Sequence, residues 1–173
     1  RERFRVQAPQ VLIVDDDAEM VGLVREELAR EGLEAVPARS GPEGLQLLRD
    51  HLVDVIVTDL RMPDIDGMEI LRIAADIQPE AKVIVITAFG SIASAIGAMR
   101  AGAFDYLSKP FEIDELILTV RKALEDTRLR QENVLLRGEV ERRYQFGSLI
   151  GASKAMEAVF DLIKRVAATD INV

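Results

Sequence analysis

Short apolar runs alternate with helix-like patterns over the first 125 or so residues. Five runs predict strands, at Val11–Val14, Glu34–Ala38, Val53–Val57, Lys82–Thr87 and Asp105–Ser108. The first, third and fourth are continuous and rich in β-branched residues, which is typical of strands covered on both faces of a parallel sheet. The second contains Pro37, which favours an edge strand.

Helical spacing fills the gaps between these runs. Apolar residues recur from Met20 to Leu28 and stop before Gly32, and Ser40–Glu43 has the form of a capping box that opens a second helix. Further helices are predicted around 67–76, around 91–101 and from Glu112. Five alternating units predict an α/β fold with a parallel sheet, right-handed crossovers and helices on both faces.

Composition removes several classes of protein. The 173 residues suffice for one domain with a proper core, and residues 1–9 precede the first strand as an extension. No apolar run approaches a membrane span and residues 1–9 have no apolar signal core, so we expect a cytoplasmic protein without membrane contact. The absence of cysteine excludes disulfides and thiolate metal sites, and the single His51 leaves no histidine pair.

The net charge is unevenly distributed. Residues 10–120 carry −12 of charge, whereas the whole chain carries −8. Such an acidic segment repels nucleic acid, so direct DNA binding by this part is not expected.

Polar residues gather where the predicted strands end. They are Asp15, Asp16 and Asp17 after the first run, Asp59 after the third, Thr87 after the fourth and Lys109 after the fifth. Ligands of such sheets bind beyond the carboxyl ends of the strands. Carboxylates brought together there repel unless a cation neutralises them, and oxygen-only ligands indicate Mg²⁺.

Asp59 is the candidate nucleophile, because aspartate accepts phosphoryl groups and Lys109 could hold a phosphoryl oxygen. Taken singly, Thr87 and Lys109 are equally well explained as ordinary strand-end residues. The other nearby acids have simpler explanations, which are a helix cap for Asp17, a turn and cap for Asp64 and Asp66 with Pro63 and Gly67, and the strand start for Asp54.

Four segments together resemble a two-component response-regulator receiver domain over residues 10–122. They are Val11–Asp17, Asp59–Gly67, Val85–Ala88 and Asp105–Phe111. The resemblance implies a flavodoxin-like, doubly wound fold with strand order 2-1-3-4-5. It also implies that a sensor histidine kinase is a partner.

The resemblance assigns roles residue by residue. It implies that Asp59 is the phosphoacceptor, and that Asp16, Asp59 and the backbone carbonyl of Arg61 bind Mg²⁺ directly while Asp15 does so through water. Lys109 would bind the phosphoryl group and precede a cis bond to Pro110. Thr87 and Tyr106 would form the switch.

The helical pattern continues beyond the receiver and predicts a linker helix at 123–144. Leu129, Asn133, Leu136 and Val140 are spaced 4-3-4, as in a short coiled-coil seam with a register-fixing Asn, and this predicts a homodimer. The alternative is a solvated helix that packs on its own domain, and Gly138 weakens the seam.

Residues 145–173 resemble the opening of the AAA+ domain of NtrC-type, sigma-54-dependent activators, with Leu149–Ser153 as the specific match. From the residues alone this segment is an amphipathic helix at Val159–Ala167 and a strand-like end at Asp170–Val173. No phosphate-binding G-x-x-x-x-G-K motif is present, so the chain itself cannot cradle ATP phosphates.

The sequence therefore predicts a regulatory phosphoacceptor module, not an enzyme, that governs an adjoining AAA+ ATPase. Sigma-54 RNA polymerase and DNA would be reached only through domains outside this chain. Two alternatives stay open, namely a Mg²⁺-dependent phosphohydrolase with a covalent Asp59 intermediate and a receiver with a different DNA-binding output.

Overall fold

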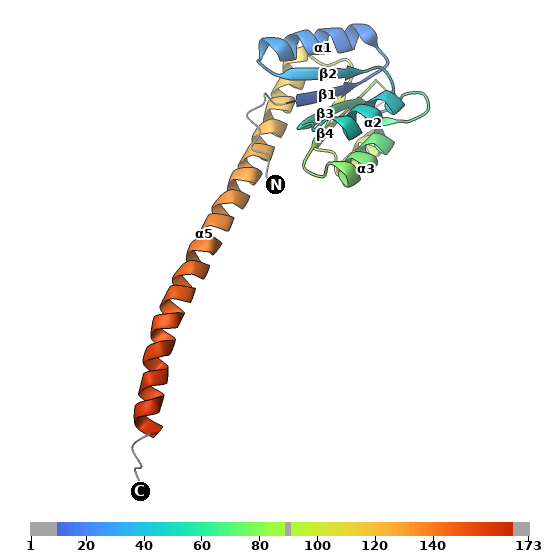
Figure 1. Ribbon diagram of the computed structural model, residues 1–173. Coiled ribbons are helices and arrows are strands. Elements are labelled where there is room, and N and C mark those ends of the chain that lie inside the picture. The colour runs from blue at the N-terminus through green and yellow to red at the C-terminus, as the bar shows by residue number, and fades with distance from the viewer. Residues whose placement is uncertain (1–9, 89–90, 168–173) are drawn as a thin grey trace. The chain divides into compact units, whose positions relative to one another are not determined.

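One parallel sheet organises the first part of the chain (Figure 1). The structure is a computed structural model that describes residues 10–88 and 91–167, with side chains as far as Val140. The strands are β1 (Gln10–Val14), β2 (Glu34–Ala38), β3 (Val55–Asp59), β4 (Lys82–Thr87) and β5 (Asp105–Ser108). Their order across the sheet is 2-1-3-4-5 and every neighbouring pair is parallel, so the predicted flavodoxin-like order is confirmed.

Two details of the strands refine the prediction. β2 lies at the edge of the sheet and pairs with β1 alone, and an edge strand tolerates Pro37 because only one of its sides must supply N–H groups to a neighbouring strand. The third strand begins at Val55 and not at Val53, because the Val53 N–H donates to the Gln78 side chain (3.0 Å) outside the sheet. Burial of Val53 therefore reflects packing and not strand pairing.

Helices cover both faces of the sheet. They are α1 (Ala18–Arg30), α2 (Gly41–Asp50), α3 (Gly67–Ile77), α4 (Ile92–Arg100) and α5 (Ile113–Ala167). The apolar side chains of α2, α3 and α4 form one core with the sheet, and those of α1 and the start of α5 form the other. Both faces being covered explains why the central strands read as continuous apolar runs.

Capping side chains fix where the helices begin. Asp17, Ser40 and Asp66 accept hydrogen bonds from the first turns of α1, α2 and α3, as predicted, and each such cap stabilises a helix by about 1 kcal/mol. The predicted capping box differs in one contact, because the Glu43 carboxylate accepts from the Arg39 N–H (2.7 Å). These helix starts lie at the carboxyl edge of the sheet.

Gln78 clamps the opposite end of α2. Its amide nitrogen donates to the carbonyls of Leu48 and His51 (2.6 Å each), so it satisfies groups that the end of a helix leaves unpaired. His51 itself is the exposed C-cap of α2 and comes before the amino end of β3, whereas the polar residues gather where the strands end. This placement agrees with the prediction that His51 is a surface residue.

Ion pairs connect the start of α5 to β4 and α1. Lys82 at the beginning of β4 pairs with Asp126 (2.8 Å), and its ammonium lies 5.9 Å from the centre of the Phe104 ring. Arg121 pairs with Glu31 at the end of α1. Thr127 is the last buried residue of this part of the helix.

α5 extends beyond the predicted linker. We expected the linker helix to end at residue 144, but α5 continues to Ala167, because the intervening residues are mostly good helix formers without proline. Residues from Leu129 onward form a separate compact unit from residues 1–128. The extension 1–9 and the strand-like end Asp170–Val173 lie outside the described residues.

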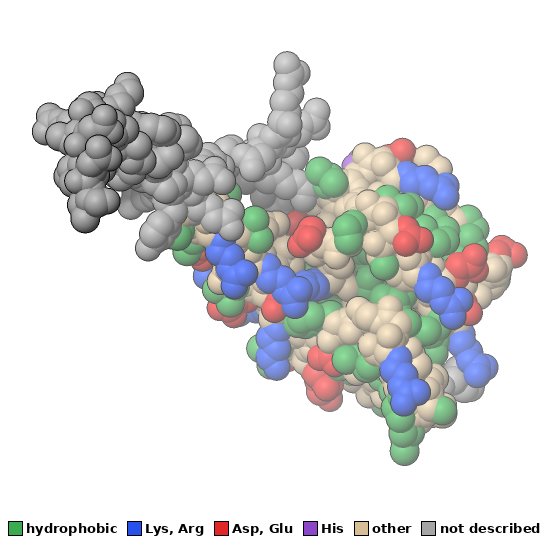
Figure 2. Space-filling model, turned by 90° about the horizontal axis from the view of Figure 1, so that it is seen from below, with side chains coloured by type: hydrophobic (Ala, Val, Ile, Leu, Met, Phe, Trp, Pro, Cys, Tyr) green, Lys and Arg blue, Asp and Glu red, His purple; other side chains and the backbone are tan. Residues whose placement is uncertain are grey.

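Side chains of both charges are mixed on the face that Figure 2 draws, with apolar side chains interspersed among them. Within residues 10–88 and 91–167, none of the helices combines the length and apolar character that a membrane crossing requires.

Candidate functional site

Three carboxylates meet at the carboxyl edge of the sheet. Asp15 and Asp16 follow β1 and Asp59 ends the neighbouring β3, and one oxygen from each lies within 4.8 Å of the others. Asp15 is fully buried and Asp59 nearly so, whereas Asp16 is exposed. The predicted convergence of these strand ends is confirmed.

Lys109 joins the two buried carboxylates. Its Nζ donates to Asp15 Oδ2 and to Asp59 Oδ2, both at 2.8 Å. The second oxygen of Asp15 accepts from the Asp17 N–H (2.8 Å), and that of Asp59 accepts from the Arg61 N–H (2.9 Å). Every oxygen of the two buried acids therefore has a donor, which orients both carboxylates rigidly.

Burial and charge act in opposite directions on this cluster. Burial raises the pKa of Asp15, and the hydrogen bonds and charge of Lys109 offset this only in part. Burial lowers the pKa of Lys109, but its two carboxylate partners outweigh that effect and the net pKa is raised. Lys109 is consequently a cation throughout the physiological pH range.

A tight loop leaves Asp59 and fixes the backbone beside it. The Ile65 N–H donates to the Pro63 carbonyl (2.8 Å), which closes a three-residue turn around Asp64, whose φ is +68°. Positive φ is unfavourable for a residue with a Cβ, so this turn is strained. The turn predicted from these residues is confirmed.

Gly67 allows the loop to return close to its own origin. A Cβ at this position would lie 2.3 Å from the Asp59 carbonyl oxygen and 2.9 Å from the Leu60 Cα. Glycine is therefore required there by close approach, and the start of α3 packs directly on the end of β3. The sequence had suggested only a turn role for this glycine.

The two predicted switch residues lie on the same side of the sheet. Thr87 is buried at the end of β4, and its carbonyl accepts from the Lys109 N–H (2.8 Å). Tyr106 pairs in register with Val85, two residues before Thr87, so both side chains face α2–α4. The Tyr106 hydroxyl is 3.4 Å from Ser94 Oγ in the first turn of α4. The predicted cis bond between Lys109 and Pro110 is present.

The donor set of the cluster suits a hard divalent cation. Asp15, Asp16 and Asp59 offer carboxylate oxygens only, and such ligands fit Mg²⁺ or Ca²⁺ better than zinc. Lys109 already neutralises part of the charge of the two buried acids. The three carboxylates therefore fit a magnesium ion.

Comparison with known proteins identifies this arrangement. The model of the response regulator receiver domain family matches residues 11–121, which include every residue of the cluster. The chain belongs to this family. The receiver is a regulatory phosphoacceptor domain, and this chain is similar to the matching part of the NtrC and DctD regulators.

Two regulators show how far the likeness extends. The chain is 39% identical to the C4-dicarboxylate transport regulatory protein DctD of Pseudomonas aeruginosa over 168 residues, which are 95% of this chain and 36% of that protein. It is 35% identical to the transcriptional regulator NtrC of Escherichia coli over 165 residues, or 94% of this chain and 34% of that protein. The chain thus spans about a third of the length of these relatives.

A solved structure shows the same fold with a modified acid. A response regulator protein from Burkholderia pseudomallei, with a phosphorylated aspartic acid, a calcium ion and citrate, has a TM-score of 0.62 and 26% identity. The match covers 71% of this chain and 72% of that one.

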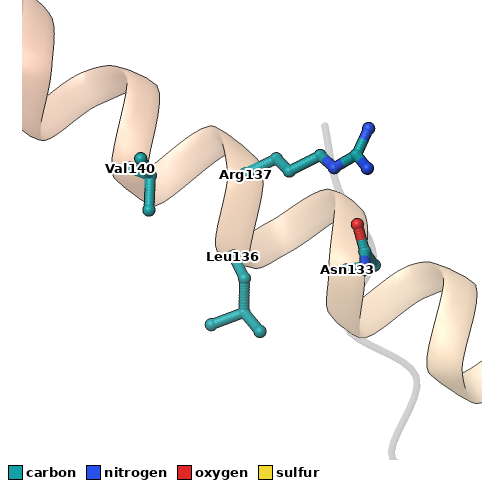
Figure 3. Close-up of a pocket in the computed structure, with 4 residues that line it drawn as sticks. All are labelled: Asn133, Leu136, Arg137 and Val140. Atoms are coloured by element: carbon teal, nitrogen blue, oxygen red, sulfur yellow. The ribbon is translucent and has the colours of Figure 1, made fainter.

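A second candidate site lies on α5. Leu129, Leu136 and Val140 are each about half exposed, and Asn133 is exposed beside them. Figure 3 shows Leu136 and Val140 projecting together from the helix, and these two line a groove with Asn133 and Arg137. The spacing predicted for a seam is thus present on the helix surface.

Proposed function

We propose that the chain is a phosphorylation-controlled switch that accepts a phosphoryl group on Asp59 from a sensor histidine kinase. The observation that carries the proposal is the position of Asp59, which ends the central strand between Lys109 and the Asp15–Asp16 pair. Asp64 and Asp66 stand in the loop beyond, where Asp66 caps α3. Asp15 shares the Lys109 partner but its side chain is fully buried, whereas the Asp59 side chain keeps 11% exposure.

Transfer to Asp59 needs no further covalent chemistry from the protein. A carboxylate oxygen of Asp59 attacks phosphorus, the bond between phosphorus and the donor's leaving group breaks, and the leaving group keeps the electron pair. The product is an acyl phosphate. The Lys109 ammonium is already 2.8 Å from Asp59 Oδ2. It would then exchange this contact for one with a phosphoryl oxygen.

Asp16, Asp59 and the Arg61 carbonyl would hold Mg²⁺, with Asp15 acting through water. Mg²⁺ supplies positive charge for the oxygens of the transferring phosphoryl group when bound. The Arg61 N–H already fixes the Arg61 backbone beside the Asp59 carboxylate (2.9 Å). Asp15 is saturated by Lys109 and the Asp17 N–H, which agrees with an indirect role.

Mg²⁺ should stabilise the folded receiver. Binding to the native state alone adds about 1.4 kcal/mol at ten times Kd, and we expect Asp16→Asn to remove most of this gain. Thermal unfolding with and without Mg²⁺ measures it. Asp17→Asn is the matched control, since it removes the same charge one residue away while Asn still caps α1. Equal loss in both variants would mean a general charge effect and no site at Asp16.

A Mg²⁺-dependent phosphohydrolase with a covalent Asp59 intermediate is the alternative from the enzyme class. Such an enzyme would usually place a second acid two residues after the nucleophile, where this chain has Arg61. The wild-type protein with acetyl phosphate and Mg²⁺ separates the two. We expect one base-labile phosphoryl group per chain and no sustained turnover of other small phosphoesters, whereas steady turnover would favour the phosphohydrolase.

Thr87 and Tyr106 would relay phosphorylation to α4. The hydroxyl of Thr87 would turn toward the phosphoryl group, and the Tyr106 ring would move into the space it leaves. α4 suits such a relay, because Ala98 is its one fully buried residue among those described while Ile92, Ile96 and Met99 are exposed. A helix held by so few apolar contacts is readily displaced.

Thr87→Ala should separate acceptance from relay. We expect phosphorylation of Asp59 to proceed at nearly the wild-type rate, while most of the phosphorylation-dependent change in hydrogen exchange of α4 is lost. Thr119→Ala is a suitable control, because its hydroxyl binds only a carbonyl of its own helix. A full α4 response in Thr87→Ala would remove this residue from the switch.

The linker would form a homodimer through Leu129, Asn133, Leu136 and Val140. Each of the three apolar side chains is half exposed, so burying the remainder contributes about 1 kcal/mol apiece. Six side chains in a dimer would contribute roughly 6 kcal/mol, against an association cost of about 4–15 kcal/mol. A modest dimer is therefore expected, and the facing Asn133 pair would fix its register.

Charges beside the seam favour parallel helices. Glu132 and Arg137 flank the seam five residues apart, a spacing at which they are not neighbours on one helix. In a parallel dimer each Glu132 would face Arg137 of the other chain, whereas an antiparallel dimer would bring like charges together. The same pair of charges recurs one heptad earlier at Glu125 and Arg130.

The whole protein would act on transcription through parts outside this chain. We propose a receiver at 10–122, a coiled-coil linker at 123–144 and the start of an AAA+ ATPase domain at 145–173, in a cytoplasmic protein. The dimer geometry would control assembly of that ATPase for sigma-54 RNA polymerase at DNA. The chain's similarity to NtrC and DctD along 94–95% of its length supports this proposal over a different output domain.

A further inference from the structure

A close contact links α2 to the loop that leaves Asp59. Gly41, the first residue of α2, is buried, and a Cβ built there would lie 2.3 Å from the Ile65 carbonyl oxygen and 2.6 Å from the Ile65 Cβ. Real Cβ atoms do not approach other atoms this closely, so the loop would have to move if Gly41 carried a methyl group. Two backbone segments far apart in sequence are thus in direct contact.

α2 also packs closely against the sheet. A Cβ on Gly44, one turn later, would lie 2.8 Å from the Val14 side chain of β1, so α2 already packs against the sheet as closely as its backbone allows. Leu45 and Leu48 are buried in the core on the same helix. A group added at Gly41 must therefore displace the Ile65 segment and not the helix.

The displaced segment belongs to the backbone that carries Arg61. From Asp59 to Gly67 the loop is held at both ends, by the Arg61 N–H on Asp59 and by the contact of Gly67 with the Asp59 carbonyl. Between them lies the strained turn at Asp64, with φ +68°. Because both ends are fixed, a displacement of Ile65 must be taken up by the short backbone segment between them, which includes Arg61.

We propose that Gly41 is a positioning residue for the cation site, acting through Ile65 on the Arg61 carbonyl. The inference rests on the proposed function, because it assumes that this carbonyl binds Mg²⁺. Mg²⁺ demands near-ideal octahedral geometry, so a ligand moved by a few tenths of an ångström binds it less well. Gly41 contacts neither the cation nor any of its side-chain ligands.

Gly41→Ala tests the proposal by its effect on Mg²⁺ affinity. We expect the dissociation constant for Mg²⁺, measured by isothermal titration calorimetry, to rise about tenfold, as is usual for residues that support metal ligands. Gly22→Ala is the matched control, since it adds the same methyl group to a helix with nothing within 4 Å. Its Mg²⁺ affinity should equal that of the wild type.

The Mg²⁺ dependence of phosphorylation separates positioning from simple destabilisation. With acetyl phosphate, Gly41→Ala should shift the half-saturating Mg²⁺ concentration upward and recover the wild-type maximal rate at saturating Mg²⁺. A partly unfolded variant would instead lose maximal rate without that shift. Unchanged half-saturation in a folded Gly41→Ala protein would overturn the proposal.

Asp64→Gly is a second variant that tests the same proposal if Gly41→Ala fails to fold. Glycine adopts positive φ without strain and adds no atom, so this variant retains the fold but loosens the turn. We expect its Mg²⁺ affinity to fall several-fold, and an unchanged affinity would count against a positioned loop. A wild type that neither binds Mg²⁺ nor accepts phosphoryl would instead refute the proposed function itself.

Discussion

Asp59→Asn should abolish the phosphoryl adduct of this protein. The wild type, incubated with acetyl phosphate and Mg²⁺, is expected to gain a single phosphoryl group that survives acid and is lost in base, as an acyl phosphate should. The amide of Asn is not a nucleophile of comparable strength, so the adduct should fall below detection. Intact-protein mass spectrometry measures both outcomes.

Asp64→Asn is the matched control for this experiment. It removes a carboxylate from the same loop, and Asn tolerates the positive φ that Asp64 adopts. We expect it to accept a phosphoryl group like the wild type. An adduct that persists in Asp59→Asn would show that a different residue is the acceptor, and peptide mapping would locate it.

Leu136→Asp should dissociate the proposed dimer. A carboxylate in the middle of the seam would be buried against its copy without a partner, so we expect the dimer to weaken by at least a hundredfold, to a monomer at tens of micromolar. Analytical ultracentrifugation of wild type and variant measures the dissociation constant. A wild type that is itself monomeric at this concentration would remove the linker helix from the mechanism.

Leu135→Asp provides the control, because Leu135 is the adjacent residue, is half exposed as Leu136 is, and lies outside the 4-3-4 spacing. It should leave the dimer intact. Orientation is tested by charge exchange at the seam margins. Glu132→Arg and Arg137→Glu should each weaken a parallel dimer, and the double variant should restore it.

The architecture of the receiver follows from local signals in the sequence. Continuous β-branched runs mark the buried strands, and Pro37 marks the edge strand, because a residue without an N–H cannot serve two ladders. The predicted strand bounds were less accurate where a residue is buried but its backbone does not pair with a neighbouring strand. Val53 is buried like a strand residue, yet Gln78, 25 positions later, takes its N–H.

The predicted end of the linker helix differs from the end of α5 for another reason. The expected boundary near residue 144 followed a change in composition, whereas helix formation depends on residue propensity, and the isolated glycines in that stretch cost only about 1 kcal/mol each. The structure therefore continues the helix to Ala167.

The chemistry of the acidic site was predictable because parallel strands bring their carboxyl ends together. Asp15, Asp59 and Lys109 each follow a strand, and the fold alone makes them neighbours. The role proposed for Gly41 was not predictable, because it depends on a loop 24 residues later, whose Ile65 carbonyl oxygen would lie 2.3 Å from a Cβ at Gly41. The sequence signal there was a helix start with glycine next to Pro42, which a capping box explains without any such contact.

The ion pair of Lys82 with Asp126 has a consequence for the linker. Asp126 lies one heptad before Asn133 and two before Val140. It therefore occupies the next seam position on the receiver side of Leu129. In the proposed dimer two aspartates facing each other there would repel, so each would remain with the lysine of its own chain. The proposed seam would therefore begin at Leu129. The spacing between Asp126 and Leu129 would set which face of the helix carries the seam, because one inserted residue would turn it by about 100° around the helix axis.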